Sequence, residues 1–297
     1  MKILLTGVNG QVGHALLSRL TEHTVVALAR EALDLTRPED IRRVVHQVQP
    51  DLIINPAAYT AVDKAESELE LAYAINATAP QVFAEEAVRL GAALIHFSTD
   101  YVYDGCKSGK YVETDTSNPV SVYGKSKLAG EEAIRSSGVS HLILRTSWVY
   151  GAYGKNFLKT ILRLAVERDS LRIVADQWGA PTSSESIADG VRKLLDTWQV
   201  KNAAQTGIYH FTNTGETTWH GFAVAIVNEY ESLKVEKKWP DLKVNSTDIL
   251  PISTADYPTP AKRPANSMLD NAKLKDTFSV ELPTWQSALK QVMRELA

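Results

Sequence analysis

The sequence has little cysteine, no long apolar run and no excess of charge of one sign. Its single cysteine, Cys106, cannot form an internal disulfide. No apolar stretch approaches the roughly 20 residues of a membrane-spanning helix, and Met1-Lys2-Ile3 leads into a strand-like run, not a signal peptide. A net charge of −3 leaves no basic surface for nucleic acid. We therefore expect a cytoplasmic protein that binds neither nucleic acid nor membranes.

What the sequence does contain is an alternation of short apolar runs and helical patterns. With 297 residues, 44% of them hydrophobic, the chain can bury a full core and make two lobes. Near-continuous apolar strands separated by helices are typical of a parallel sheet covered on both faces. The first half therefore predicts an α/β fold with a Rossmann-type doubly wound sheet. The expected strands are 3–5, 25–29, 52–55, 93–98 and 142–146, and the expected helices are 38–48, 66–90 and 121–137.

The second half is less regular and predicts a smaller, mixed carboxy-terminal lobe. Helices are expected at 156–168, 184–198 and 219–230, a strand at 171–174, and a strand at 207–211 that returns to the main sheet. We divide the chain into a dinucleotide-binding domain, 1–150, with returning elements near 184–215, and a mainly substrate-binding lobe, 151–297.

A glycine-rich turn follows the first expected strand and precedes a helical pattern. Gly7 permits a tight turn, Gly10 lets the backbone approach a pyrophosphate, and Gly13 allows the helix to pack close to the strand. The helix amino terminus attracts negative charge. The order of strand, turn and helix therefore predicts a dinucleotide site.

Arg30 stands at the end of the second expected strand, where an acidic residue holds the ribose 2′-hydroxyl of NAD. A guanidinium there suits a 2′-phosphate, so we expect NADPH as the preferred cofactor, with NADH possible; alternatively Arg30 points to solvent. Asp34 and Leu35 either line the adenine pocket or belong to an ordinary helix start with Thr36 as its N-cap.

Tyr123 and Lys127 are four residues apart and therefore share one face of the expected helix. An ammonium close to a tyrosine favours the phenolate and lowers its pKa toward neutrality. Thr99, at the end of the fourth expected strand, adds a hydroxyl for the same substrate oxygen. The trio fits proton transfer to a carbonyl that receives a hydride, although the spacing alone is also that of an exposed amphipathic turn.

These motifs resemble the extended short-chain dehydrogenase/reductase superfamily and, within it, the dTDP-4-dehydrorhamnose reductases. The resemblance runs nearly end to end. It is carried by GVNGQVG (7–13), AAYTAVDKAE (57–66), STDYVY (98–103), YGKSKLAGE (123–131), RTSWVY (145–150), DQWGAPT (176–182) and PTPAKRP (258–264).

The resemblance implies reduction of the C4 ketone of a dTDP-linked 4-keto-6-deoxy-L-sugar to give dTDP-L-rhamnose. It implies that Tyr123 is the proton donor, that Lys127 bonds the nicotinamide ribose, and that Thr99 orients the carbonyl. The implied cofactor contacts are Gly10, Gln11 and Val12 at the pyrophosphate, Arg30, Asp34 and Leu35 near the adenosine, and Ala58, Tyr59 and Thr60 beside the cofactor.

For the sugar nucleotide, the resemblance implies contacts from Thr99, Asp100 and Trp148. Asn156, Lys155 and Arg263 are candidates for its diphosphate because a guanidinium fork suits phosphate oxygens. The alternative for Lys155 and Arg263 is ordinary surface charge, and the alternative for Trp148 is core packing. His96, inside an apolar strand, is predicted to be a core histidine and not a catalyst.

Some members hold Mg²⁺ between two subunits through glutamates, one of them in the first helix. The matching position here is Ala15, although Glu185 and Glu295 remain. A hard cation needs several oxygen ligands, so Mg²⁺ stays open as a doubtful second cofactor, and we assign no metal ligands and expect a monomer or weak homodimer.

Three other functions stay open. A nucleotide-sugar dehydratase needs an acid/base pair after the threonine, but Asp100 is followed by Tyr101. An epimerase needs a cofactor that stays bound through the cycle. A non-catalytic, dinucleotide-binding regulatory subunit would share the fold without turnover.

Overall fold

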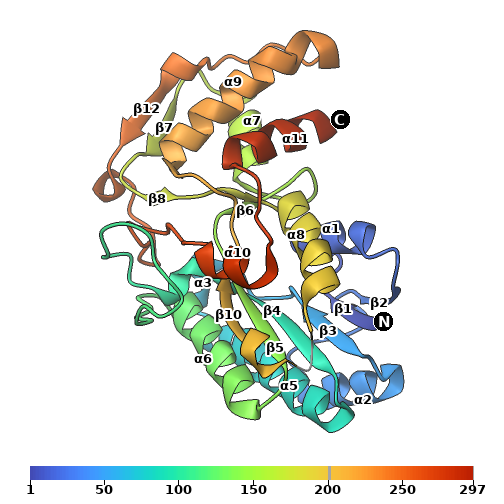
Figure 1. Cartoon of the computed structure of the whole chain (residues 1–297). Coiled ribbons are helices and arrows are strands. Elements are labelled where there is room, and N and C mark those ends of the chain that lie inside the picture. The colour runs from blue at the N-terminus through green and yellow to red at the C-terminus, as the bar shows by residue number, and fades with distance from the viewer. Residues whose placement is uncertain (200–201, 297) are drawn as a thin grey trace.

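The computed structural model describes residues 1–199 and 202–296, and a six-stranded parallel sheet forms the centre of its larger lobe (Figure 1). The strand order is β10-β5-β4-β3-β1-β2. The predicted Rossmann-type fold is confirmed, with each expected apolar run forming a strand. The strands are β1 (Lys2–Thr6), β2 (Thr24–Leu28), β3 (Leu52–Asn55), β4 (Ala93–Thr99), β5 (His141–Thr146) and β10 (Gly207–His210).

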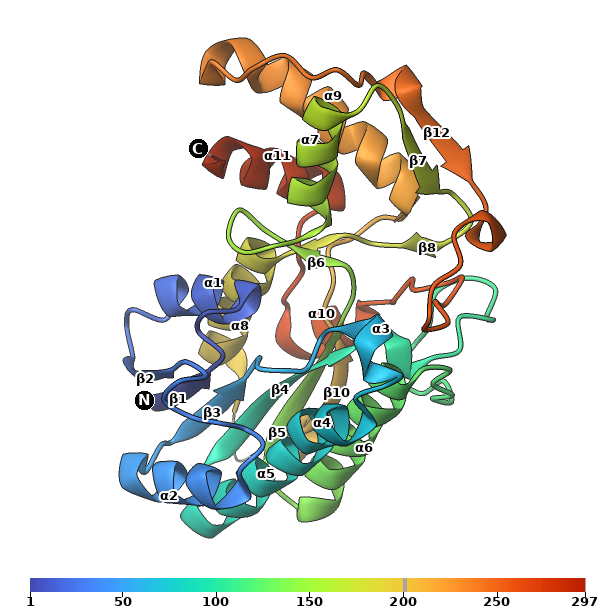
Figure 2. The same cartoon turned by 180° about the vertical axis from the view of Figure 1, so that it is seen from behind.

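Helices cover both faces of this sheet (Figures 1 and 2). Successive strand residues point to opposite faces, so Ile3 and Leu5 pack into one core while Leu4 packs into the other. The first face carries α1 (Gln11–Arg19), α8 (Ser184–Thr197) and α10 (Ala272–Phe278), and the second carries α2 (Pro38–Val48), α5 (Ala79–Leu90) and α6 (Val122–Ser137).

A π-helix, η1 (Ala74–Thr78), interrupts the helix expected over 66–90. It joins α4 (Leu69–Tyr73) to α5, and α3 (Val62–Ala65) precedes both. A single wide turn leaves the apolar periodicity nearly unchanged, so the sequence pattern did not reveal it. The helix after β2 begins at Pro38 with Arg37 as its N-cap, so the alternative that made Thr36 the N-cap is wrong.

The smaller lobe forms a layer of helices and short strands above the sheet in both views (Figures 1 and 2). Its core contains Phe222, Ile226 and Trp285. Helix α9 runs past the predicted end at Tyr230. The elements are α7 (Phe157–Glu167), α9 (Trp219–Lys237), α11 (Trp285–Glu295), and the parallel pair β7 (Leu171–Val174) and β12 (Ile249–Ile252).

Short segments connect the two lobes. The two-residue strands are β6 (Val149–Tyr150) with β9 (Thr182–Ser183), and β8 (Trp178–Gly179) with β11 (Thr217–Thr218). Single 3₁₀ turns are η2 (Asp100–Val102), η3 (Ala203–Gln205), η4 (Ser246–Asp248) and η5 (Thr254–Asp256).

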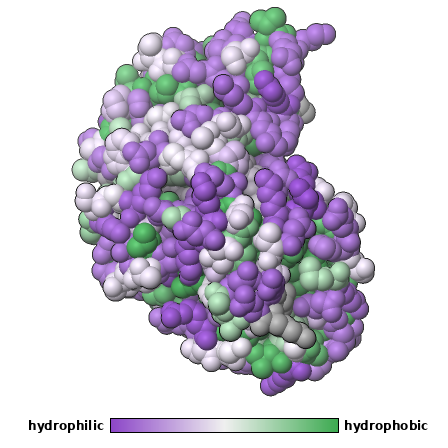
Figure 3. All heavy atoms as spheres, in the orientation of Figure 1, coloured by the Kyte–Doolittle hydropathy of each residue, from purple (hydrophilic) through white to green (hydrophobic). Residues whose placement is uncertain are grey.

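The surface is mostly polar. Figure 3 shows hydrophilic residues over most of one face, with hydrophobic ones in small groups and an indentation between the lobes. No helix in the described part of the chain has the length and apolar character needed to cross a membrane.

Candidate active site

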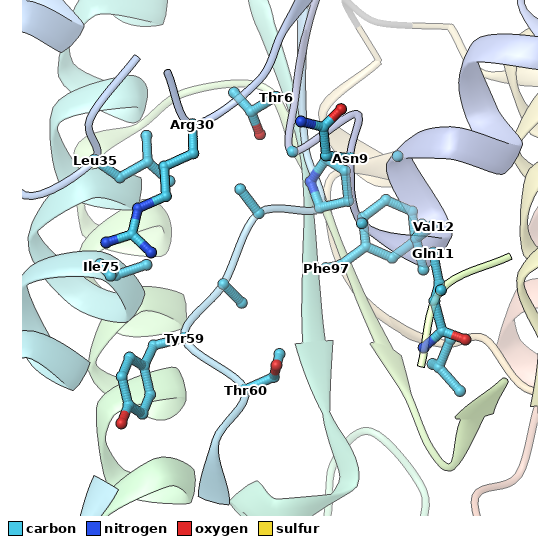
Figure 4. A pocket seen from close by; sticks show the side chains of 18 of the residues that line it. Thr6, Asn9, Gln11, Val12, Arg30, Leu35, Tyr59, Thr60, Ile75 and Phe97 are labelled. Carbon is cyan, nitrogen blue, oxygen red and sulfur yellow. The ribbon is translucent and has the colours of Figure 1, made fainter. Parts of the chain in front are cut away.

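A cavity of about 600 Å³ opens beyond the carboxyl ends of the parallel strands (Figure 4). It lies between the turns that follow β1 and β3, the place where the strand order reverses and where such sheets bind ligands. Every residue predicted to bind the cofactor lines it: Gly7, Gly10, Gln11, Val12, Gly13, Arg30, Asp34, Leu35, Ala58, Tyr59, Thr60, Tyr123 and Lys127.

The glycine turn makes a cradle that side chains would fill. Gly7 has φ +60°, a left-handed conformation that favours glycine. A Cβ on Gly13 would stand 2.2 Å from the Gly7 carbonyl oxygen, so helix α1 can lie this close only without a side chain. The Gly10 amide donates to the same carbonyl at 2.8 Å. Together with the amino terminus of α1, these features fit a bound pyrophosphate.

Arg30 is exposed, and it forms no ion pair or hydrogen bond with any other described residue. In Figure 4 its guanidinium extends into the cavity on the side of Leu35 and Ile75, opposite Gln11 and Val12. Asp34 accepts hydrogen bonds from the Thr36 amide and hydroxyl at 3.0 and 2.8 Å, and the amide contributes most to lowering the pKa of that carboxyl. A free guanidinium beside a fixed turn fits a 2′-phosphate.

Asn76, in the π-helix, fixes the segment that holds Ala58, Tyr59 and Thr60. Its side chain is fully buried, accepts from the Tyr59 amide at 2.9 Å, and donates to the Tyr59 carbonyl at 3.1 Å and to Ser126 Oγ at 3.0 Å. Our sequence reasoning missed Asn76. The available signal was an asparagine among apolar residues of a helical stretch.

Tyr123 stands in the first turn of α6 and faces the cavity. The hydroxyl of Ser121 caps this helix by accepting from the Gly124 amide at 3.1 Å. Burial raises the pKa of the Tyr123 phenol, and a hydrogen bond with Thr99 lowers it by less. The ring of Tyr101 packs edge-on against Tyr123, with centroids 5.4 Å apart.

Lys127 is buried one turn further along α6. We predicted that it lowers the pKa of Tyr123, but this prediction is wrong, because the pKa of Tyr123 is raised. Its ammonium donates to the Phe97 carbonyl at 2.7 Å and lies 3.2 Å from Nε2 of His96. Burial lowers the pKa of Lys127 to about 8, opposed by the Glu131 carboxylate. The two side chains thus share a cavity wall, while the contacts of the ammonium are with strand β4.

Thr99 ends strand β4, Asp100 begins the 3₁₀ turn η2, and both are buried. The Thr99 hydroxyl donates to Asp100 Oδ1 at 3.0 Å and accepts from the Tyr101 amide at 3.2 Å. Burial raises the pKa of Asp100 to about 6. Its Oδ2 is buried with no close hydrogen-bond partner among the described residues, and Ser267 and Thr99 both act to lower the pKa of this carboxyl. Neither Thr99 nor Asp100 lines the cavity.

Trp148 adopts φ +49°, which is uncommon for a bulky residue. Its indole stacks on Trp219 with centroids 3.7 Å apart. Gly179 lies directly against it, because a Cβ there would approach Trp148 Cε2 to 2.6 Å. Trp148 is half-buried and does not line the cavity itself.

Three predicted substrate contacts are placed differently from one another. Lys155 lines the cavity. Asn156 caps α7, accepting from the Lys159 amide at 3.1 Å, and donates to Gln11 Oε1 at 2.9 Å. Arg263 forms an ion pair with Asp63 at 2.7 Å. Neither Asn156 nor Arg263 lines the cavity.

The cavity also contains residues to which we assigned no role. Asn9, Ala57, Phe97 and Thr146 follow or end the strands whose neighbouring residues we did identify. Thr146 Oγ1 is buried with no hydrogen-bond partner in the described structure. The rule that ligands bind at strand carboxyl ends also selects these positions. Our predictions assigned roles to the residues beside them and not to these four.

The two remaining candidates for a metal, Glu185 and Glu295, line one small cavity together. Within residues 1–199 and 202–296, no three or more His, Cys, Asp or Glu side chains come together as a metal site. Glu185 receives a hydrogen bond from the Ala152 amide at 3.3 Å and one from Ser184 at 3.2 Å.

Comparison with known proteins matches the whole chain. The family model described as RmlD substrate binding domain matches residues 1–297. A dTDP-4-dehydrorhamnose reductase of Burkholderia thailandensis is 49% identical, with 100% of this chain and 99% of the relative covered. A crystal structure of such a reductase from Clostridium acetobutylicum superposes with a TM-score of 0.90 at 36% identity, covering 99% of both chains. One from Bacillus anthracis, in complex with NADP, gives 0.88 at 35% identity, again covering 99% of both. The chain therefore belongs to the RmlD family of dTDP-4-dehydrorhamnose reductases.

Proposed function

We propose that this chain reduces the C4 ketone of dTDP-4-dehydro-L-rhamnose to give dTDP-L-rhamnose, with NADPH as the preferred reductant. The observation that carries the proposal is that Tyr123 and Lys127 line the same cavity as the glycine turn. Family membership over the full length of the chain supports it.

The residues of the cavity suit a dinucleotide with a 2′-phosphate. The Gly7–Gly13 turn and the amino terminus of α1 receive the pyrophosphate, and the free guanidinium of Arg30 receives the 2′-phosphate. Asp34 and Leu35 border the adenosine, and Ala58, Tyr59 and Thr60 border the remainder of the molecule. When bound, NADPH supplies the hydride that reduces the ketone carbon.

The chain supplies the proton and the orientation. Burial keeps Tyr123 protonated, so its hydroxyl donates a proton to the ketone oxygen as that oxygen gains charge. Thr99 turns its hydroxyl proton from Asp100 Oδ1 to the same oxygen, and the Asp100 carboxylate then accepts from a sugar hydroxyl. Trp148 forms a flat apolar wall for the sugar, while Asn156 and Arg263 act on the diphosphate side.

The test is a reductase assay with purified protein. Oxidation of NADPH is followed by absorbance in the presence of dTDP-4-dehydro-L-rhamnose, and the product is identified by mass spectrometry and NMR. We expect turnover to dTDP-L-rhamnose. Tight NADPH binding without turnover would contradict the reductase reading and favour a binding subunit, while an inverted or dehydrated product would favour an epimerase or dehydratase.

A further inference from the structure

His96 lies in the middle of β4 and is completely buried, yet its ring touches the cavity lysine. Nε2 is 3.2 Å from Lys127 Nζ, and the carbonyl of the next residue, Phe97, accepts from the same ammonium at 2.7 Å. Two neighbouring groups of one strand therefore occupy two of the three N–H directions of Lys127. Lys127 also lines the cavity, so its third N–H is the one available there.

The other ring nitrogen of His96 begins a buried chain that crosses the sheet. Asn55 is the register partner of His96 on β3, and its amide nitrogen lies 3.2 Å from Nδ1. The amide oxygen of Asn55 lies 2.7 Å from the hydroxyl of Thr6, the last residue of β1. All of these side chains are buried.

Counting donors and acceptors fixes the tautomer of His96. Burial, together with the charge of Lys127, lowers the pKa of His96 well below its ordinary value, so the ring is neutral and carries one N–H. An ammonium can only donate, so Nε2 must be the lone-pair nitrogen and Nδ1 must carry the proton. Asn55 then turns its carbonyl oxygen to Nδ1–H and its NH₂ group to Thr6, which exchanges the two amide positions given above.

We propose that His96 is a positioning residue for Lys127, with its Nε2 lone pair holding the ammonium so that the third N–H points into the cavity. Asn55 and Thr6 hold the Nδ1–H tautomer that this requires. The inference rests on the proposed function for the role of that third N–H at the cofactor, but not for the contact itself.

The charges around the pair are few. Lys127 faces His96 from α6, and Glu131, one turn beyond Lys127, acts on it through its charge. Glu131 is itself paired with Arg145 of β5 and accepts from Ser98 of β4. The carboxylate of Glu131 is thus already bonded to Arg145. Removal of His96 would leave the Phe97 carbonyl as the remaining hydrogen-bond acceptor of the Lys127 ammonium among these contacts.

The tautomer can be measured without any enzymatic activity. In ¹⁵N-histidine-labelled protein, the signals of His96 are identified among those of the seven histidines by their loss in His96→Gln. We expect Nδ1 to carry the proton and Nε2 to be unprotonated. A proton on Nε2 would overturn the inference, whether or not the protein proves to be a reductase.

Three substitutions separate positioning from packing. His96→Gln can place an acceptor near the former Nε2, whereas His96→Asn reaches only the Nδ1 side and His96→Phe fills the volume without an acceptor. We expect kcat to fall about 10- to 100-fold in the Asn and Phe variants, because misplacing a group by about 1 Å costs on the order of 100-fold. The Gln variant is expected to retain most of the rate.

The pH profile supplies a readout that loss of packing alone would not move. An acceptor favours the charged amine, so its loss in His96→Phe lowers the pKa of Lys127 and moves the alkaline limb of kcat to lower pH. In His96→Gln the alkaline limb of kcat is expected to stay in place.

His141→Gln is the matched control. His141, the first residue of β5, is also buried, but its ring bonds to the Val139 carbonyl. This variant is expected to change thermal stability but not the limb. If the alkaline limb of kcat lay at the same pH in His96→Phe, His96→Gln and the wild-type protein, the inference would be overturned.

Discussion

Tyr123 illustrates how burial decides the role of a single side chain. Its surroundings raise the pKa of the phenol, so in the proposed reaction it serves as the proton donor. We predict that Tyr123→Phe lowers kcat about 10²- to 10⁴-fold, the range for loss of a general acid. Dissociation constants for NADPH, measured by fluorescence titration, are expected to stay near the wild-type value. Retention of the full rate would exclude Tyr123 as the proton donor.

Lys127 gives the expected pH dependence. Burial lowers its pKa to about 8, so the ammonium is present below that pH and is lost as the pH rises through it. We predict that kcat falls on the alkaline side near pH 8. Lys127→Arg serves as the comparison, since a guanidinium stays charged throughout, and its residual activity should lack this limb. A limb of the same position in the arginine variant would assign it to another group.

Arg30 is the residue to which we attribute the proposed preference for NADPH. Its guanidinium is exposed and has no partner among the described residues, so Arg30→Ala should leave the melting temperature nearly unchanged. A charge-assisted hydrogen bond is worth about 1.5–3 kcal/mol, and each 1.4 kcal/mol is about tenfold. We therefore predict a roughly 10- to 100-fold rise in the KM for NADPH with the KM for NADH unaffected. Equal Michaelis constants for both cofactors in the wild-type protein would refute this preference.

At the scale of elements, the π-helix holds the segment after β3 through one side chain. Asn76→Ala would leave the amide and carbonyl of Tyr59 without their partners. Leaving buried polar groups unpaired costs about 1–3 kcal/mol, so we predict a loss of that size in chemical denaturation and a raised KM for NADPH. Asn245→Ala is the control: Asn245 accepts from the Thr247 amide at 2.9 Å at an exposed turn. The control should lose about 1 kcal/mol at most, with no change in KM.

The elements themselves were largely predictable because each has a local cause. Leu52–Asn55 and Leu171–Val174 form strands with the predicted bounds, since short apolar runs bounded by turns specify them. Helix α9 continues past its predicted end at Tyr230 to Lys237, and Leu233 of this extension packs into the core of the smaller lobe. The π-turn at Ala74–Thr78 adds one residue without breaking the apolar pattern, so periodicity could not reveal it.

The residues of the candidate site were predictable from the strand ends, but the hydrogen bonds and ion pairs between their side chains were not. The cavity residues follow from the rule that parallel strands present their carboxyl ends at one edge. That Lys127 would bond β4 and His96 depends on side-chain directions inside α6, which spacing does not give. Asp63 and Arg263 are 200 positions apart, so no local sequence pattern could predict their ion pair.

At the scale of the whole molecule, the Asp63–Arg263 pair ties the carboxy-terminal strap, residues 254–266, to α3 of the larger lobe. The Arg263 side chain donates to Asp63 at 2.7 Å and to the Tyr101 hydroxyl at 3.3 Å, and the Ala261 amide donates to Asp63 at 3.2 Å. Tyr101 in turn packs against Tyr123. The strap is thus connected to Tyr123 through the side chains of Arg263 and Tyr101.

Two roles for Arg263 give different results in a double-mutant cycle. The side chains of Asp63 and Arg263 are 40% and 22% exposed, so their pairing should contribute about 1 kcal/mol or less to stability. If Arg263 acts by holding the strap, Asp63→Asn and Arg263→Gln should each raise the KM for the sugar nucleotide by a similar factor, about tenfold. The double variant would then be no worse than either single one. If instead Arg263 binds the diphosphate, its loss should be the more severe by far, and Asp63→Asn should change the KM little. Steady-state kinetics of the three variants, with NADPH affinity as the internal control, separate the two roles.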